Sequence, residues 1–483
     1  MEQTFLWHDY ETFGISAQAD RPAQFAAIRT DAYLIEIGEP SNIMCRPAPD
    51  YLPDPASCLV TGITPQHCLQ HGLTEQAFAA RIHAALSQAK TIGVGYNSIR
   101  FDDEFTRFLF WRNLIDPYGR EWQDGCGRWD LLDVMRLAHA LRPDGIHWPQ
   151  HENGTTSFKL EHLSAANGLE HDSAHDALSD VRATVALARL LKTVQPKLFA
   201  FALGLHKKER VAQELGLPAT QQSAQPFLHV SGMLPAQHGF MAVMWPLASH
   251  PVNRNEIIAW DLRHDPQELV GLSAAEIRER LFVKSDSLPD GVQRLPIKGV
   301  HLNRSPMVVR NLNVLERQQA QRWQIDLEQA LRHAETARTL PDMSAMWAEV
   351  FARPQAAAAA IDVDGDLYAG FVSAADRRKL EGLRGLSGER LGDARTGFED
   401  ARLEELFWRY RARNFPDSLS ESDRLRWREH CTARLLEGQG GARTLDDFLA
   451  ALDALHAGAS TGGIAVLDAL QEYAEQIVPE FSG

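Results

Sequence analysis

The first 195 residues alternate short apolar runs with amphipathic helical patterns, and this alternation restricts the possible fold more than any other feature of the chain. Two apolar runs, at residues 5–9 and 91–96, predict buried strands. The helical patterns between and after them cover residues 75–89, 104–114, 131–141 and 177–194. We therefore expect an α/β domain around a mixed sheet, ending at the natural helix stop Gln195-Pro196.

The pattern changes twice beyond this point. From about Phe227 to Leu302, short apolar runs separated by Gly, Pro, Asn and Asp predict a small, mostly antiparallel β unit. After Leu312 the chain turns helical, and Arg353-Pro354-Gln355 with the five alanines that follow predicts a junction. Further helices are expected at residues 403–413, 422–435 and 445–455. Because 483 residues exceed one compact core, we expect three domains, at residues 1–195, 196–345 and 346–483.

Charge is distributed unevenly along the chain. The net charge of −15 is unusual for a protein that binds a polyanion, since phosphate contacts normally need a basic surface. Only residues 196–345 are net positive, with 17 Lys and Arg against 15 Asp and Glu. Divalent metal ions would mask part of the acidity of residues 1–195.

The cysteines and the opening residues indicate where the protein works. The five cysteines are odd in number and never form a CxxC motif, so we expect neither a disulfide framework nor a zinc site, and a reducing cytoplasm fits best. The first residues lack the pattern of a Sec signal, and no segment offers about 18 uninterrupted apolar residues. We expect neither a Sec signal nor a membrane span.

The segment Asp362–Asp366 (DVDGD) resembles the start of an EF-hand loop. Its glycine occupies loop position four instead of six, and Ser373 stands at position twelve, where a calcium loop needs glutamate. We therefore expect no calcium site here.

Asp9 and Glu11 form a carboxylate pair at the end of the first predicted strand. Residues two apart on a strand point to the same face, so these like charges repel unless a cation lies between them. Oxygen ligands suit Mg²⁺, and the apolar run before the pair predicts a rigid platform. The alternative is a solvated strand end without a metal.

Asp102 and Asp103 follow the second predicted strand and precede a helix. Either residue could simply cap that helix, and Asp103 is the better candidate for the cap. Asp102 would then supply a third carboxylate.

His175 and Asp180 stand at the start of a long predicted helix. Five residues turn a helix by about 140°, so the two side chains cannot share a face if both are helical. We expect Asp180 within the first turns and His175 on or before the first turn, where it can swing toward a shared site. Taken singly, His175 could be a loop histidine and Asp180 a solvated helix residue.

Together, these three segments resemble the active-site pattern of the DEDD family of 3′–5′ exonucleases, in its histidine-containing branch. The segments HDYETFG, DRPAQFAAIRTD, GYNSIRFDDE, RWDLLDVMR and AHDALSDVRAT, with HVSGM, HPVNRN and YRARNFP later, are similar to the bacterial exonuclease I family over nearly the full length. The resemblance implies a ribonuclease H-like exonuclease domain, a small SH3-like DNA-binding barrel and a helical C-terminal domain that helps to close a passage around the strand.

The resemblance also implies an enzyme that degrades single-stranded DNA from its 3′ end to nucleoside 5′-monophosphates, in DNA repair and recombination. Two Mg²⁺ ions, for which Mn²⁺ could substitute, would be anchored by Asp9, Glu11 and Asp180, with Asp102 as a more distant ligand. His175 would be the general base, because its ordinary pKa near 6.5 lets it accept a proton from water at neutral pH.

Contacts to DNA and to a protein partner are expected on both the first and the middle domain. The 3′ end would lie close to Glu11, with Lys159 as a phosphate contact. A groove for a single strand needs cations and stacking surfaces, and its candidates are Trp122, Arg136, Arg142, Asn255, Lys298 and Arg304. Each of these could instead be a surface cation or a core aromatic residue.

The family is also known to dock on the acidic C-terminal tail of single-stranded DNA-binding protein, which needs a basic rim beside an apolar pocket. Arg142 and Arg310 are the candidates for this rim, and ordinary solvated surface is the alternative. We expect a monomer without membrane contacts. Two rival functions stay open: an exoribonuclease of the same family, and a non-catalytic nucleic-acid-binding scaffold.

Overall fold

A computed structural model describes residues 2–169, 176–219, 223–352 and 361–481. The chain forms two compact units. The first contains residues 1–127, 171–185 and 357–483, and the second contains residues 128–170 and 186–356. The predicted junction after Arg353 lies outside the described residues.

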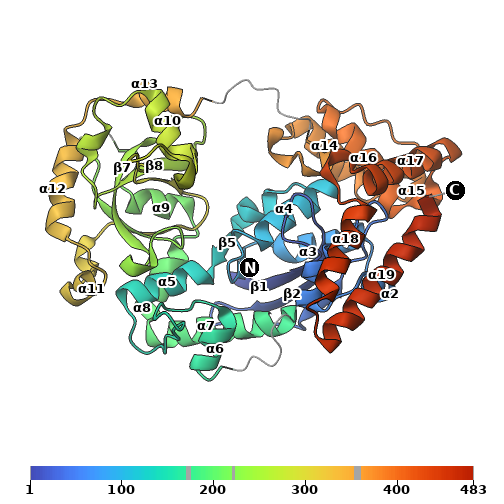
Figure 1. Cartoon of the computed structure of the whole chain (residues 1–483), viewed down its shortest axis with the longest axis horizontal. Coiled ribbons are helices and arrows are strands. Elements are labelled where there is room, and N and C mark those ends of the chain that lie inside the picture. The colour runs from blue at the N-terminus through green and yellow to red at the C-terminus, as the bar shows by residue number, and fades with distance from the viewer. Residues whose placement is uncertain (1, 170–175, 220–222, 353–360, 482–483) are drawn as a thin grey trace. The chain divides into compact units, whose positions relative to one another are not determined.

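The first unit is built on a mixed sheet, as expected. Its strands β1 (Thr4–Thr12), β2 (Pro22–Thr30), β3 (Ser41–Met44) and β4 (Thr91–Gly95) lie in the order β3-β2-β1-β4. Strand β1 runs antiparallel to β2, with Phe5 opposite Thr30, and parallel to β4, with Phe5 opposite Ile92. Figure 1 shows β1 and β2 side by side. Because β1 has a neighbour on each side, its backbone is a rigid support for the side chains near its end.

Four helices accompany this sheet: α1 (Pro55–Thr61), α2 (Pro65–His71), α3 (Glu75–Leu86) and α4 (Asp102–Arg112). The first three begin at side-chain caps, and the Thr74 hydroxyl accepts from the Ala77 N–H at the start of α3. Helices α3 and α4 pack Phe78 and Phe110 against Phe25 of the sheet. Helix α3 ends at Leu86, three residues before the end that the sequence predicted at residue 89.

The C-terminal helices of the first unit are α14 (Ala374–Leu383), α15 (Gly388–Gly392), α16 (Ala401–Asn414), α17 (Glu421–Glu437), α18 (Leu445–His456) and α19 (Thr461–Phe481). Trp111 of α4 shares a core with Leu380 and Leu403, and Tyr51 shares another with Leu467. Helices α18 and α19 lie side by side (Figure 1). The helical C-terminus predicted from the sequence is confirmed, and it shares apolar cores with α4 and with residues beside the sheet.

The aspartates of the segment 362–366, for which no calcium site is expected, bind arginines. Asp362 lies 2.8 Å from Arg409 and 3.2 Å from Arg434. Asp364 lies 2.5 Å from Arg413 and 3.0 Å from Arg21, and Asp366 lies 3.8 Å from Arg402. Burial raises the pKa of Asp364, but the neighbouring Arg413 and Arg21 outweigh it and hold this pKa below its ordinary value. The carboxylates are thus neutralised by the protein itself.

The second unit contains the expected antiparallel β structure. Strands β6 (Phe227–Val230), β7 (Met241–Ser249), β8 (Glu256–Asp261), β9 (Ile297–His301) and β10 (Met307–Val309) form a sheet in the order β10-β6-β7-β8-β9. All four pairings are antiparallel, and β10 extends the β unit beyond the predicted end at Leu302.

Helices flank this sheet in the sequence on both sides. Before it come α5 (Leu131–Leu141), α6 (Leu160–Ala166), α8 (Pro196–Gly204) and α9 (Lys208–Glu214). Within and after it come α10 (Ala274–Phe282), α11 (Arg317–Arg322), α12 (Leu327–Arg338) and α13 (Ser344–Val350). Strand β5 (Gly127–Asp130) and helix α7 (Ala177–Val194) each belong partly to both units.

Two sequence expectations concern the whole chain. Among the described residues, no helix is long and apolar enough to cross a membrane. The five cysteines are all unpaired and buried.

Candidate active site

Strand β1 holds the first two carboxylates. Its residues Phe5, Leu6 and Trp7 are buried, whereas Asp9 is only half-buried and Glu11 is 8% exposed. Asp9 lies opposite Ala26 of β2 and Glu11 opposite Gln24, so the extended backbone persists through both acids. The pairing becomes irregular only between Glu11 and Thr12. The two side chains therefore leave the same face of the sheet, as their spacing predicts.

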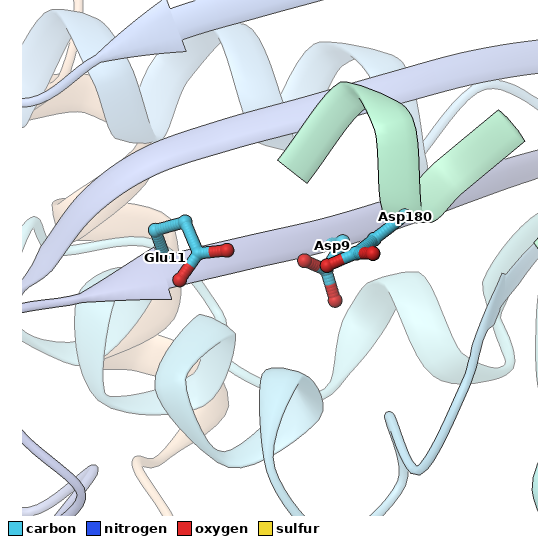
Figure 2. A group of neighbouring side chains, drawn as sticks. All are labelled: Asp9, Glu11 and Asp180. Atoms are coloured by element: carbon cyan, nitrogen blue, oxygen red, sulfur yellow. The ribbon is translucent and has the colours of Figure 1, made fainter. Parts of the chain in front are cut away.

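Helix α7 brings a third carboxylate to this pair. Asp180 lies in its first turn, and single oxygens of Asp9, Glu11 and Asp180 all lie within 4.8 Å of one another. In Figure 2 the carboxylates of Asp9 and Asp180 face each other, and Glu11 lies farther along the same strand. The sequence predicted these three residues as metal ligands, and the fold brings them together.

The electrostatics of this cluster suit a cation. Burial raises the pKa of Asp9 well above its ordinary value, and the negative charges of Asp102 and Glu11 raise it further. Burial likewise raises the pKa of Glu11 to about 8, with Asp180 and Asp176 adding to the effect. A divalent cation between the carboxylates would cancel this repulsion and favour their ionised forms. The three acids thus offer the hard oxygen donors that a divalent metal ion prefers.

Asp102 lies next to the cluster but outside the group of three. Its side chain is 2% exposed, and Oδ1 accepts a hydrogen bond from the backbone N–H of Tyr10 at 3.0 Å. Tyr10 stands between Asp9 and Glu11, so this bond ties the start of α4 to the end of β1. The sequence contained no signal for it, because any residue other than proline at position 10 could donate it.

The prediction that Asp103 caps the following helix is wrong. Helix α4 starts at Asp102, its N-cap position is Phe101, and no side chain caps it. Asp103 is 1% exposed and pairs with the buried Arg120 guanidinium at 2.5 Å. The ion pair takes this carboxylate because, once both groups are buried, either charge would be costly without its opposite partner.

The site also has a neighbour that the sequence interpretation missed. Asp176 immediately precedes α7, and its Oδ2 accepts from the backbone N–H of Ser179 at 3.1 Å. Its Oδ1 accepts from the side-chain amide of Gln24 at 3.4 Å. An aspartate directly before a helical pattern is a recognised cap signal, so the cap could have been predicted. The contact with Gln24 could not have been predicted from the sequence. His175, the predicted general base, lies outside the described residues.

In the first unit, the predicted DNA contact Trp122 is 65% exposed and follows the short 3₁₀ turn Gly119–Glu121. An exposed indole offers a ring face to which a base could stack. In the second unit, Lys159 is exposed and its ammonium lies 3.4 Å from Glu161.

The remaining cations and amides of the predicted groove lie in the second unit in differing surroundings. Arg136 pairs with Asp133 at 2.6 Å and its guanidinium lies over the ring of Phe240, so it is largely committed to packing. Asn255 accepts a hydrogen bond from Lys208. Lys298, on β9, is half-buried, and Arg304 is exposed after this strand.

The two arginines predicted to meet a protein partner are also in the second unit. Arg142 donates to the backbone carbonyl of Val314 at 3.0 Å and lies 3.5 Å from Glu316. Arg310 is exposed, and its backbone N–H donates to Glu214 at 3.1 Å. Both arginines thus border the segment that follows β10.

Comparison with known proteins gives family models over most of the chain. Residues 6–188 match the family described as Exonuclease, residues 206–353 the Exonuclease I SH3-like domain, and residues 361–477 the Exonuclease I C-terminal domain. Exodeoxyribonuclease I of Escherichia coli (strain K12) is 43% identical over 481 residues, which are 99% of this chain and 98% of that protein. Exodeoxyribonuclease I of Haemophilus influenzae is 42% identical, over 88% of this chain and 89% of that protein.

Solved structures agree with these matches. Exonuclease I from Methylocaldum szegediense superposes with a TM-score of 0.93 at 45% identity, and the E. coli enzyme in complex with a dA16 oligonucleotide with 0.93 at 42%. A complex described as ExoI/SSB-Ct has a TM-score of 0.90 at 41% identity. Each comparison covers 99% of this chain and 100% of the other.

Proposed function

Because this chain belongs to the exodeoxyribonuclease I family, we propose that it removes nucleotides one at a time from the 3′ end of single-stranded DNA, with Mg²⁺ held by Asp9, Glu11 and Asp180. The observation that carries this proposal is the convergence of these carboxylates, from one strand and one helix, within 4.8 Å of one another. A scaffold protein without catalysis has no need for such a costly concentration of buried negative charge.

The chain's residues divide the work of phosphodiester hydrolysis between them. Two Mg²⁺ ions, once bound, supply positive charge that stabilises the attacking and leaving oxygens. Asp9, Glu11 and Asp180 hold this charge in place, and the sheet fixes the first two. Asp102, which accepts from the Tyr10 N–H at 3.0 Å, would be a more distant ligand. Mn²⁺, which takes similar oxygen ligands, can substitute.

We assign the general base to His175. It immediately precedes Asp176, which caps α7, so it belongs to the segment that leads into the helix carrying Asp180. An imidazole with an ordinary pKa near 6.5 accepts the proton of the attacking water at neutral pH. Cleavage then leaves the 3′-hydroxyl on the shortened strand and the phosphate on the released nucleoside 5′-monophosphate.

We propose that residues of the first unit and residues of the second unit each contact the strand. The E. coli relative has been solved with a dA16 oligonucleotide, which supports single-stranded DNA as the substrate here. The exposed Trp122 would stack on a base. The backbone phosphates and the 3′ end would meet the polar and cationic residues predicted from the sequence, namely Lys159, Arg136, Asn255, Lys298 and Arg304.

We also propose a protein partner, the acidic tail of single-stranded DNA-binding protein. The ExoI/SSB-Ct complex of a relative supports this choice. Arg142 and Arg310 would form the basic rim of the docking site. Calorimetry with a tail peptide should give micromolar, salt-sensitive binding that Arg142→Ala and Arg310→Ala weaken while activity on bare DNA persists. If no peptide binds at low salt, this partner is wrong.

The cellular setting follows from the same proposal. An enzyme of this kind serves DNA repair and recombination as a monomer. We propose the cytoplasm as its location, because the five unpaired, buried cysteines fit a reducing compartment. We propose residues 1–195, 196–345 and 346–483 as its functional domains. Cell fractionation tests the location, size-exclusion chromatography tests the monomer, and expression of the separate segments tests the domains.

One assay tests the central proposal. Wild type and Asp9→Asn are incubated with end-labelled single-stranded DNA, duplex DNA and RNA of one sequence, with Mg²⁺, Mn²⁺ or EDTA. We expect mononucleotide release from single-stranded DNA by wild type with either metal and none with EDTA or Asp9→Asn. Preference for RNA would instead identify an exoribonuclease, and metal-independent cleavage would refute the assigned site.

A further inference from the structure

Asp176 determines where helix α7 begins. Its Oδ2 accepts the Ser179 N–H at 3.1 Å, and its backbone carbonyl accepts the Asp180 N–H at 3.0 Å. A side-chain cap of this kind fixes the backbone of the first helical turn, because it satisfies an N–H that has no partner within the helix. Since Asp180 lies in that turn, the position of its carboxylate depends on Asp176.

Gln24 ties this cap to the sheet. Its side-chain Nε2 donates to Asp176 Oδ1 at 3.4 Å and to Asn42 Oδ1 at 2.9 Å. Gln24 is only 3% exposed and lies directly opposite Glu11 in the pairing of β1 with β2. A buried amide holds its orientation because a lost hydrogen bond would not be replaced by water. The hydrogen bond from Gln24 therefore holds the start of α7 beside the strand position that pairs with Glu11.

Asp176 and Asp180 are four positions apart at the start of α7. Four residues advance an α-helix by about 400°, so positions four apart lie near the same face. Asp176 raises the pKa of both Asp9 and Glu11 through its negative charge. It is nevertheless not one of the three acids within 4.8 Å.

We propose that Asp176 and Gln24 form a clamp that positions Asp180 against Asp9 and Glu11 for metal binding. This positioning role rests on the metal-dependent function proposed above. Asp176 acts through Asp180 and is not itself a ligand. Hydrogen bonds that orient metal ligands commonly change metal affinity by about 10- to 100-fold, so the clamp should be measurable without any DNA present.

Three variants separate the clamp from a helix cap that only stabilises the fold. Gln24→Leu removes the donor and leaves the cap intact. Asp176→Asn keeps an oxygen for the Ser179 N–H but replaces the oxygen that accepts from Gln24 with an amide. In the double variant Gln24→Glu/Asp176→Asn, the carboxylate introduced at position 24 accepts from the amide introduced at position 176, and the net charge equals that of wild type.

The control is Asp326→Asn, since Asp326 caps α12 by accepting the Gln329 N–H at 2.9 Å and belongs to the other unit. Mn²⁺ binding to the DNA-free proteins is measured by calorimetry, thermal unfolding is measured in EDTA, and the Mg²⁺ concentration for half-maximal nuclease activity is measured with single-stranded DNA.

We expect Gln24→Leu and Asp176→Asn each to weaken Mn²⁺ binding by about tenfold and to raise the Mg²⁺ requirement in parallel. The double variant should regain most of the affinity, and Asp326→Asn should match wild type. The clamp is refuted if the single variants bind Mn²⁺ as wild type does, if they lose only thermal stability, or if the double variant regains nothing. An inactive wild type would instead refute the proposed function, whereas an active wild type with unaffected variants refutes the clamp alone.

Discussion

The metal-free protein should become more stable when Glu11 loses its charge. Burial raises the pKa of Glu11 from the ordinary 4.5 to about 8, so the folded protein prefers the protonated acid over a range where the unfolded chain is already ionised. Each pH unit in that range lowers the free energy of unfolding by about 1.4 kcal/mol. At pH 7 the folded protein holds Glu11 mostly protonated, and taking up this proton destabilises the metal-free fold by up to about 3 kcal/mol relative to the ionised unfolded chain.

The sign of the pH dependence follows from the same values. Between pH 4.5 and about 8 the folded state binds the proton more readily than the unfolded chain, so wild-type stability falls as the pH rises through this window. Glu11→Gln keeps the shape and removes this dependence. The variant should exceed wild type by about 3 kcal/mol at pH 7 in EDTA and match it near pH 4.5.

Urea unfolding in EDTA at pH 4.5, 6, 7 and 8 measures this difference, with the exposed Glu349→Gln as control. Mg²⁺ at about 1,000 times its Kd should reverse the order at pH 7, because a ligand at that concentration stabilises the protein that binds it by about 4.1 kcal/mol, which exceeds the advantage of the variant. The reasoning is refuted if Glu11→Gln is no more stable than wild type at pH 7 without metal, or if the gain is independent of pH.

Four further outcomes are expected. Asp180→Ala should abolish metal-dependent nucleotide release while circular dichroism stays unchanged, and His175→Ala should lower turnover by about 10²- to 10⁴-fold with Mn²⁺ binding retained in calorimetry. Replacing Lys298 and Arg304 together by Gln should flatten the salt dependence of DNA affinity by roughly 0.7 in slope per lost phosphate contact, measured by fluorescence anisotropy. Arg413→Met should destabilise the protein by about 3–5 kcal/mol in urea unfolding, since it removes the buried guanidinium that Asp50 and Asp364 share. A smaller loss would show that their other cationic partners compensate.

Local patterns predicted much of the fold because they are properties of neighbouring residues. The helix expected at 131–141 and the one at 177–194 have these bounds in the structure. The spacing of Asp9 and Glu11 placed both acids on one face of a strand, since the period of a strand is two residues. The sequence by itself therefore determined the type of these elements and the chemistry that they carry.

Contacts between distant residues were decided only by the tertiary structure. Asp103 was predicted to cap a helix and instead forms an ion pair with Arg120. Asp176 accepts a hydrogen bond from Gln24, which lies 152 positions earlier in the chain. Arg413 finds Asp50 across 363 positions. A carboxylate has the same local sequence preferences whether it binds a metal, a backbone N–H or a guanidinium. Which partner it meets depends on how the sheet and helices pack, because only packing brings these groups within hydrogen-bond distance and removes the water that would otherwise compete.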